Sequence, residues 1–123
     1  MAPPSRAWNI GAWVASGLLF LLYVVLASPP KLTGDPQAVE GFIKYGYNDG
    51  FRVFIGTCEL LGGIGLLIPR FSFWAATGLS IIMLGAAYTH ISHGELVQSS
   101  GAWIALALLG VILSVRRDQA RLT

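Results

Sequence analysis

Three long stretches of this 123-residue chain carry no charged side chain. They cover residues 7–30, 71–94 and 96–115, and a fourth apolar run, 53–69, contains a single charge, Glu59. A helix of about 20 apolar residues, rising about 1.5 Å per residue, crosses the roughly 30 Å hydrocarbon core of a bilayer. We therefore predict four transmembrane helices, at about 7–28, 51–69, 72–93 and 99–116.

The composition excludes the main alternatives to a membrane protein. Charged residues make up 11% of the chain and hydrophobic residues 54%, whereas an ordinary soluble domain carries about 25% charged residues. A soluble globular domain, a disordered chain and a multidomain enzyme are thereby excluded. Because the backbone must satisfy its own hydrogen bonds in lipid, and no run shows the alternation of a barrel strand, the spans are expected to be helices. The predicted fold is an all-α, four-helix membrane bundle that forms one domain over residues 1–123.

The distribution of lysine and arginine predicts the orientation in the membrane. Four spans place both termini on one side of the membrane. That side carries five lysine or arginine residues, Arg6, Arg70, Arg116, Arg117 and Arg121. The other side carries three, Lys31, Lys44 and Arg52. The positive-inside rule then places both termini in the cytoplasm, and we expect a multi-pass protein of a bacterial inner membrane. The expected partners are the lipid bilayer and other membrane-protein subunits or further copies of the chain. The net charge of +2 requires no nucleic acid.

The segment between the first two spans has features of its own. Pro29-Pro30 is expected to end the first helix, because proline lacks the N–H that the helix needs. Asp35-Pro36 then resembles a helix N-cap followed by proline in the first turn. Apolar side chains follow at helical spacing, at Val39, Phe42, Ile43 and Tyr47. We predict a short amphipathic helix, which either rests on the lipid headgroups or forms a lid over a cavity.

Glu59 is the most informative single residue. It lies near the middle of the second predicted span, where a carboxylate is costly unless it faces the protein interior and finds a partner. Arg52, Gly56, Glu59 and Gly63 form one stripe, and the two glycines would let a neighbouring helix approach closely. Two interpretations are open, a structural glutamate that links two helices and a glutamate that faces a ligand or a proton path.

Helix geometry suggests a partner for Glu59. If the second and third spans are antiparallel neighbours, Tyr88 lies about one turn from Glu59 along the bundle axis. Side chains on a helix tilt towards its N-terminus, so these two side chains lean towards each other, whereas Arg52 leans away. We predict a Glu59–Tyr88 hydrogen bond.

The remaining polar and small residues suggest contacts and not catalysis. His90 and His93, with Glu95, are too thin a ligand set for a metal, so we predict no metal site and expect polar residues that cap the third helix. Gly78 and Gly85 are expected to form a second helix-contact strip. The only cysteine, Cys58, excludes an intrachain disulfide and a self-contained dithiol oxidoreductase.

Several short motifs together resemble the DoxX-like membrane protein family. They are KLTGDP at 31–36, GTCELLGG at 56–63, LLIP at 66–69, and MLGAA at 83–87 followed by Thr89-His90. The resemblance covers about residues 12–115 and implies a four-helix membrane bundle. It also singles out His90, which matches a family position. The founding name of the family belongs to subunits of a thiosulfate:quinone oxidoreductase, and relatives are linked to redox partners or receptor assembly.

Two functions follow as hypotheses. We favour a non-catalytic accessory or assembly subunit of a larger membrane complex, in keeping with short loops and the absence of a catalytic motif. The alternative is a protein that binds a quinone or another small apolar ligand near Glu59 and takes part in membrane oxidoreductase chemistry. No cofactor is predicted under the first hypothesis, and a quinone is the ligand considered under the second. Internal room near Glu59 distinguishes them.

Overall fold

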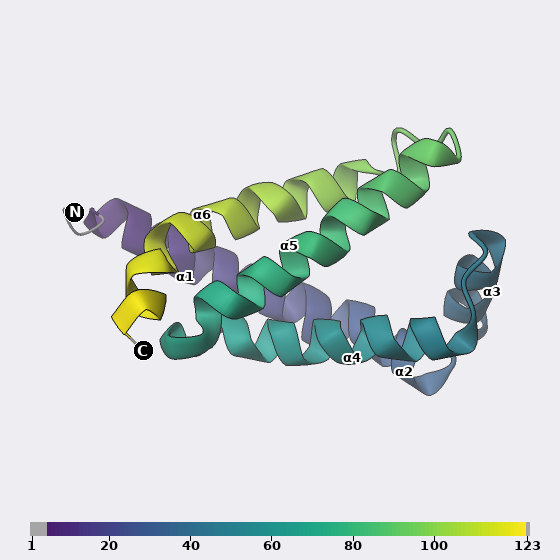
Figure 1. Ribbon diagram of the computed structural model, residues 1–123, viewed down its shortest axis with the longest axis horizontal. Coiled ribbons are helices and arrows are strands. Elements are labelled where there is room, and N and C mark those ends of the chain that lie inside the picture. The colour runs from purple at the N-terminus through teal and green to yellow at the C-terminus, as the bar shows by residue number, and fades with distance from the viewer. Residues whose placement is uncertain (1–4, 123) are drawn as a thin grey trace.

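Every regular element in the computed structural model is helical. The structure describes residues 5–122, with side chains described as far as Arg117, so the side chain of Arg121 lies outside the described part. The elements are α1 (Arg6–Phe20), η1 (Leu21–Ala27), α2 (Ser28–Thr33), α3 (Pro36–Lys44), α4 (Asp49–Leu66), α5 (Pro69–Ser92) and α6 (Ser100–Leu122) (Figure 1). Within the described residues there is no strand, so the all-helical prediction is confirmed.

The first helix continues past the two prolines, so the predicted end at Pro29-Pro30 is wrong. η1 is π-helical, and the Ser28 N–H bonds to the carbonyl of Tyr23, five residues earlier. Pro29 and Pro30 then occupy the first turn of α2, where a missing N–H costs least. Gly34, with a φ of +78°, ends α2 in the left-handed conformation that glycine adopts without strain. Lys31 therefore lies on a helix and not in a loop.

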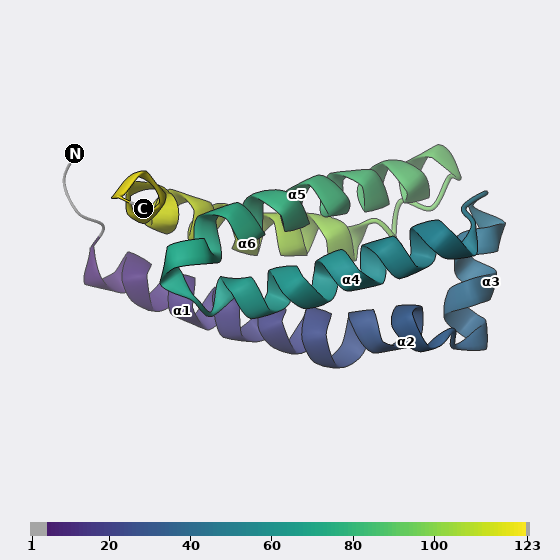
Figure 2. The same cartoon turned by 60° about the horizontal axis from the view of Figure 1, so that its bottom comes forward.

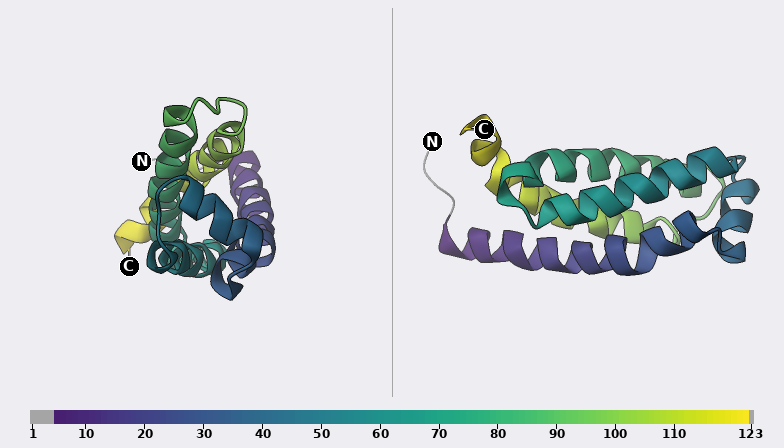
Figure 3. Two further views of the ribbon diagram at one scale, coloured as in Figure 1. Left: turned by 90° about the vertical axis from the view of Figure 1, so that its right-hand side faces the viewer. Right: turned by 90° about the horizontal axis from the view of Figure 1, so that it is seen from below.

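Within the described residues, the continuous segment α1–η1–α2 and the helices α4, α5 and α6 run along the length of the molecule (Figures 1 and 2). α5 packs against α4 and α6, and α1 packs against α6 and α4. The start of α1 and the end of α6 lie together at one end, here called the terminal end, and α3 lies across the opposite end, here called the α3 end (Figure 3). A short connection at Leu67 and Ile68 turns the chain from α4 into α5.

The interior is apolar and the outer surface is apolar as well. The largest buried side chains include Tyr23, Leu19, Leu79, Leu109 and Ile112. Large hydrophobic side chains are also exposed along the whole length of the helices, as at Leu26, Leu61 and Ile104. A surface of this kind would be costly in water and suits contact with lipid.

Two of the four glycines expected at helix contacts lie at close approaches. A Cβ on Gly56 would lie 2.9 Å from Cβ of Lys31, and a Cβ on Gly63 would lie 2.8 Å from Cγ2 of Val24. Only a residue without a side chain allows α4 to approach the first helix this closely. Gly78 and Gly85 differ, because a Cβ on either would meet no atom within 4 Å. The expected contact strip on α5 is therefore wrong for these two positions within the described chain.

In the described part of the chain, three helices are long and apolar enough to cross a membrane. They are Arg6–Thr33, Pro69–Ser92 and Ser100–Arg117. The 18 residues of α4 are not among them, and they include the charged side chains Asp49, Arg52 and Glu59. The helix bounds also differ from prediction: the first span extends to Thr33, the second is shifted by two or three residues, the third begins three residues earlier, and α6 continues to Leu122. The chain is a small integral membrane protein.

Candidate functional site: an apolar cavity with an ion pair

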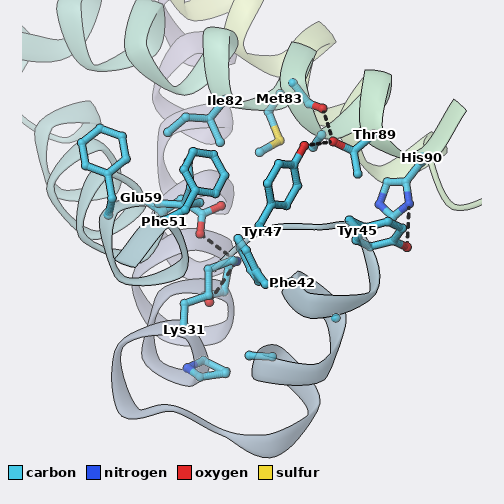
Figure 4. Close-up of a pocket in the computed structure, with 18 of the residues that line it drawn as sticks. Lys31, Phe42, Tyr45, Tyr47, Phe51, Glu59, Ile82, Met83, Thr89 and His90 are labelled. Atoms are coloured by element: carbon cyan, nitrogen blue, oxygen red, sulfur yellow. Dashed lines mark hydrogen bonds and ion pairs between the residues drawn. The ribbon is translucent and has the colours of Figure 1, made fainter. Parts of the chain in front are cut away.

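A large cavity lies towards the α3 end of the molecule. Its volume is about 790 Å³, and its lining comes from η1, α2, α3, α4 and α5. Near this end α2 packs on α4 and α3, and within the described residues neither η1 nor α2 reaches α5. The helices thus pack closely near the terminal end and leave a partly open cavity between them near the other. Its position is shown in Figure 4.

Glu59 lies at the cavity wall and pairs with Lys31. The Lys31 Nζ atom is 2.8 Å from Glu59 Oε1, and the Glu59 side chain is 4% exposed. The first helix and α4 run in opposite directions, so the tilt of each side chain towards its own N-terminus brings them together. The pair joins two helices, and both residues line the cavity (Figure 4).

The predicted Glu59–Tyr88 hydrogen bond is wrong. Tyr88 lies on the outer surface of α5 and is 73% exposed. Glu59 leans as expected, but Tyr88 does not line the cavity. The physical reason for the error is that Lys31, on the extended first helix, is the nearer and oppositely charged group.

Arg52 fixes the position of Lys31 without touching the Glu59 carboxylate. Its Nη1 donates to the backbone carbonyl of Lys31, and its Nη2 lies 3.4 Å from Asp49 Oδ1. The carbonyl belongs to the last turn of α2, where a cation is favourable. Gly34 follows at the end of α2, with Arg52 Nη1 close to where its Cβ would lie. Arg52 is therefore a positioning residue for the ion pair.

Aromatic rings form the wall near the α3 end. The centroids of Tyr47 and Phe51 are 4.8 Å apart, and Phe42 lies 6.0 Å from Tyr47 and 6.3 Å from Phe51. The Tyr47 hydroxyl is 2.7 Å from Thr89 Oγ1 on α5. Phe42 lies on α3, while Tyr47 lies beyond the end of this helix. These rings face Ile82 and Met83 across the cavity (Figure 4).

A polar cluster connects the end of α3 to the α5–α6 connection. Glu95 receives Lys44 Nζ on Oε2 at 2.8 Å and the Tyr45 hydroxyl on Oε1 at 2.6 Å. His90 Nδ1 lies 3.0 Å from the same Oε1 atom. We call Lys44, Tyr45, His90 and Glu95 the latch. It joins segments that lie about fifty residues apart in sequence, directly beside the cavity.

Three members of the latch, Lys44, Tyr45 and Glu95, lie outside the membrane-spanning helices and have shifted pKa values. Hydrogen bonds from Lys44, Tyr45 and His90, in that order, lower the pKa of Glu95 to about 2. The hydrogen bond to Glu95 raises the pKa of Lys44 and also that of Tyr45. At neutral pH the cluster therefore holds a carboxylate, an ammonium group and a neutral phenol, the combination that binds most strongly.

Sequence reasoning identified Glu59, Arg52 and His90 but missed their most important partners. Lys31 was assigned to a loop because of the two prolines. Proline is tolerated in the first turn of a helix, so the two prolines are also compatible with a helix that carries Lys31. No pattern along the sequence indicates that Tyr45 and Glu95 meet, since no helix periodicity links positions fifty residues apart.

The remaining candidates lie elsewhere. His93 Nδ1 lies 2.8 Å from the carbonyl of Thr89. In the described part of the chain, no three residues of the His, Cys, Asp or Glu type are grouped as metal ligands. Cys58 is a free thiol on α4. The arrangement as a whole offers an apolar volume, a ring-lined wall and one pair of opposite charges, which suits binding of a small molecule.

Long apolar helices around an internal cavity define this protein as a small helical membrane protein. A model of the DoxX-like family matches residues 14–115. The match covers most of the chain, so the protein belongs to the DoxX-like family, and the resemblance is confirmed. No curated protein matches the chain. No solved structure matches it either.

Proposed function

We propose that this protein binds a small apolar molecule in the cavity beside Glu59. The observation that supports this proposal is the cavity itself, which has a volume of about 790 Å³, a largely apolar lining and the Lys31–Glu59 ion pair on its wall. Ligand sites in proteins are typically concave, mostly apolar and supplied with a few polar groups that orient the ligand. The internal room favours the ligand-binding hypothesis over a purely structural bundle.

The proposed ligand reaches the cavity from the bilayer. Lining residues such as Phe54 on α4 and Ile81 on α5 are 60% and 66% exposed on the lateral surface. Because such a surface faces acyl chains and not water, a lipid-soluble molecule has the shorter route. A quinone belongs to this class of molecule, and a role in membrane oxidoreductase chemistry extends the proposal.

The proposed topology is a four-helix transmembrane bundle with both termini in the cytoplasm of a bacterial inner membrane. In this topology α4 crosses the membrane together with the three longer apolar helices, since its length of about 27 Å approaches the hydrocarbon thickness and its Glu59 is paired with Lys31. α3 then forms the lid on the outer side, held by the latch. Reporter fusions after residues 46, 68 and 96 test this topology, and a cytoplasmic signal at 46 or 96 would contradict it.

The role as an accessory or assembly subunit, bound to other membrane proteins or to further copies of this chain, remains a prediction from sequence. It is compatible with ligand binding, because a subunit of a larger complex can carry a ligand. Purification in native lipid followed by identification of stoichiometric partner proteins tests it.

A matched pair of alanine substitutions tests the binding function. Ala86 lines the cavity on α5, whereas Ala107 lies exposed on α6 and does not line it. We expect protein extracted with its surrounding lipid to retain a small apolar compound in the wild type and in Ala107→Phe, and to retain less of it in Ala86→Phe, where the ring enters the cavity. Extraction and mass spectrometry measure the compound. Equal retention in both variants would contradict binding in this cavity.

A further inference from the structure

The ion pair leaves two hydrogen-bonding positions without a protein partner. An ammonium group has three N–H donors. Lys31 Nζ lies 2.8 Å from Glu59 Oε1 and donates to the carbonyl of Ala27 at 3.2 Å. Lys31 Nζ donates no further hydrogen bond to a described residue, and Glu59 Oε2 accepts none from one; Oε1 is buried and has only its ion-pair contact with Lys31. Both residues line the cavity.

The Lys31 ammonium group and the Glu59 carboxylate lie together on the wall of a largely apolar cavity. A polar group that faces an apolar volume without a partner is unfavourable, so a ligand that supplies both partners is selected. A hydroxyl group does so alone, because it donates one hydrogen bond and accepts others. An ether or a ketone only accepts, and it would leave Glu59 Oε2 unsatisfied.

The charge of the lining selects a neutral ligand. In the described part of the chain, Lys31 is the only lysine or arginine that lines the cavity, and it already faces Glu59. Asp35 adds a second carboxylate to the lining, nearer the α3 end. An anionic head would meet excess negative charge in a medium that screens poorly. A fatty acid or another carboxylate is thus disfavoured.

The aromatic wall opposite α5 favours a ligand that contains a ring. Phe42, Tyr47 and Phe51 present their rings within about 6 Å of one another, and aromatic faces and edges pack favourably against a further ring. Taking the binding function proposed above as given, we propose that the ligand is a neutral, hydroxyl-bearing ring compound whose hydroxyl bridges Lys31 and Glu59. Of a quinone and its hydroquinone, the hydroquinone has this chemistry.

Three naphthalenes that share one ring system test the inference. 2-Naphthol carries a hydroxyl, 2-methoxynaphthalene accepts only, and 2-naphthoate is an anion. Binding is measured by titration calorimetry of the full-length protein in lipid nanodiscs, with empty nanodiscs correcting for partition into the bilayer. We expect naphthol to bind at least about tenfold more tightly than methoxynaphthalene, which is what one charge-assisted hydrogen bond contributes, and naphthoate to bind most weakly.

A double variant provides the matched control. Lys31→Met combined with Glu59→Leu removes both hydrogen-bonding groups and leaves no unpaired charge, a replacement that buried ion pairs often tolerate. We expect methoxynaphthalene to bind within about threefold of its wild-type affinity and the preference for naphthol to disappear. The wild-type comparison does not depend on this variant.

Each result separates the inference from the proposed function. Equal affinity of the wild type for all three compounds, or tightest binding of naphthoate, would overturn the inference and leave ligand binding intact. A double variant that keeps the preference for naphthol would also overturn it, because the hydroxyl would then be recognised elsewhere. Failure of every naphthalene to bind would overturn the proposed function itself.

Discussion

The close contact of α4 with the first helix depends on Gly63 having no side chain. A Cβ at this position would lie 2.8 Å from Val24 Cγ2 and 3.2 Å from Tyr23 Cβ. Tyr23 Cβ is fixed to the backbone of η1, and Val24 is β-branched with one strongly preferred rotamer in a helix, so rotation of its side chain is costly. Gly63→Ala therefore forces α4 and η1 apart.

The magnitude follows from two opposing contributions. Adding a methyl group to a well-packed contact costs about 1–3 kcal/mol. Alanine is a better helix former than glycine by about 1 kcal/mol, a gain that applies to both folded helices. For Gly63→Ala the net loss in the free energy of unfolding is therefore about 0–2 kcal/mol. For Gly78→Ala, where a Cβ meets nothing within 4 Å, only the gain remains.

Reversible unfolding by sodium dodecyl sulfate in mixed micelles, followed by tryptophan fluorescence, measures both variants. We expect the unfolding midpoint of Gly63→Ala to fall at or below that of the wild type, and that of Gly78→Ala to match or exceed it. The difference between the two variants isolates the packing cost of about 1–3 kcal/mol. An equal shift in the same direction for both would refute the argument that α4 and η1 are in close contact.

Three further predictions concern the ion pair and the latch. Lys31→Met alone should lower the free energy of unfolding by about 3–5 kcal/mol, because it leaves Glu59 charged and unpaired, and adding Glu59→Leu should restore most of the loss in the same titration. Hydrogen bonds from Lys44, Tyr45 and His90 lower the pKa of Glu95 to about 2, so Glu95 stabilises the latch fully above its ordinary pKa of about 4.3 and loses this effect as the pH falls towards 2. The distribution of distances between spin labels on α3 and α6 should broaden over that pH range, and Glu95→Gln should abolish the pH dependence. Tyr47→Phe should broaden the same distance distribution at neutral pH and lower the free energy of unfolding by about 0.5–1.5 kcal/mol, because the hydrogen bond to α5 is lost. An unchanged distribution would show that this bond does not hold α3.

Much of the helical architecture could be predicted because the bilayer constrains it strongly. Charge-free runs must be helices that span the hydrocarbon, and a lone glutamate within an apolar run must face a partner. The direction in which Glu59 leans was also predictable from the tilt of helical side chains. These inferences depend on local sequence alone.

The partners could not be predicted, because they depend on where chain segments far apart in sequence meet. Two prolines normally end a helix, and only the π-helical turn before them, with its bond from Ser28 N–H to the Tyr23 carbonyl, carries the first helix on to Lys31. The latch likewise depends on how α3 folds back towards Glu95. Periodicity describes one helix at a time and contains no information on such contacts.

The exposure of cavity-lining side chains on the lateral surface has a consequence for how any ligand is measured. A molecule that enters from lipid equilibrates with the cavity at its concentration in the bilayer, not in the surrounding water. Each additional methylene group favours the membrane by about 0.8 kcal/mol, or about fourfold in concentration. A homologous series with longer tails should therefore show rising apparent affinity in water and nearly constant affinity when expressed per mole of lipid.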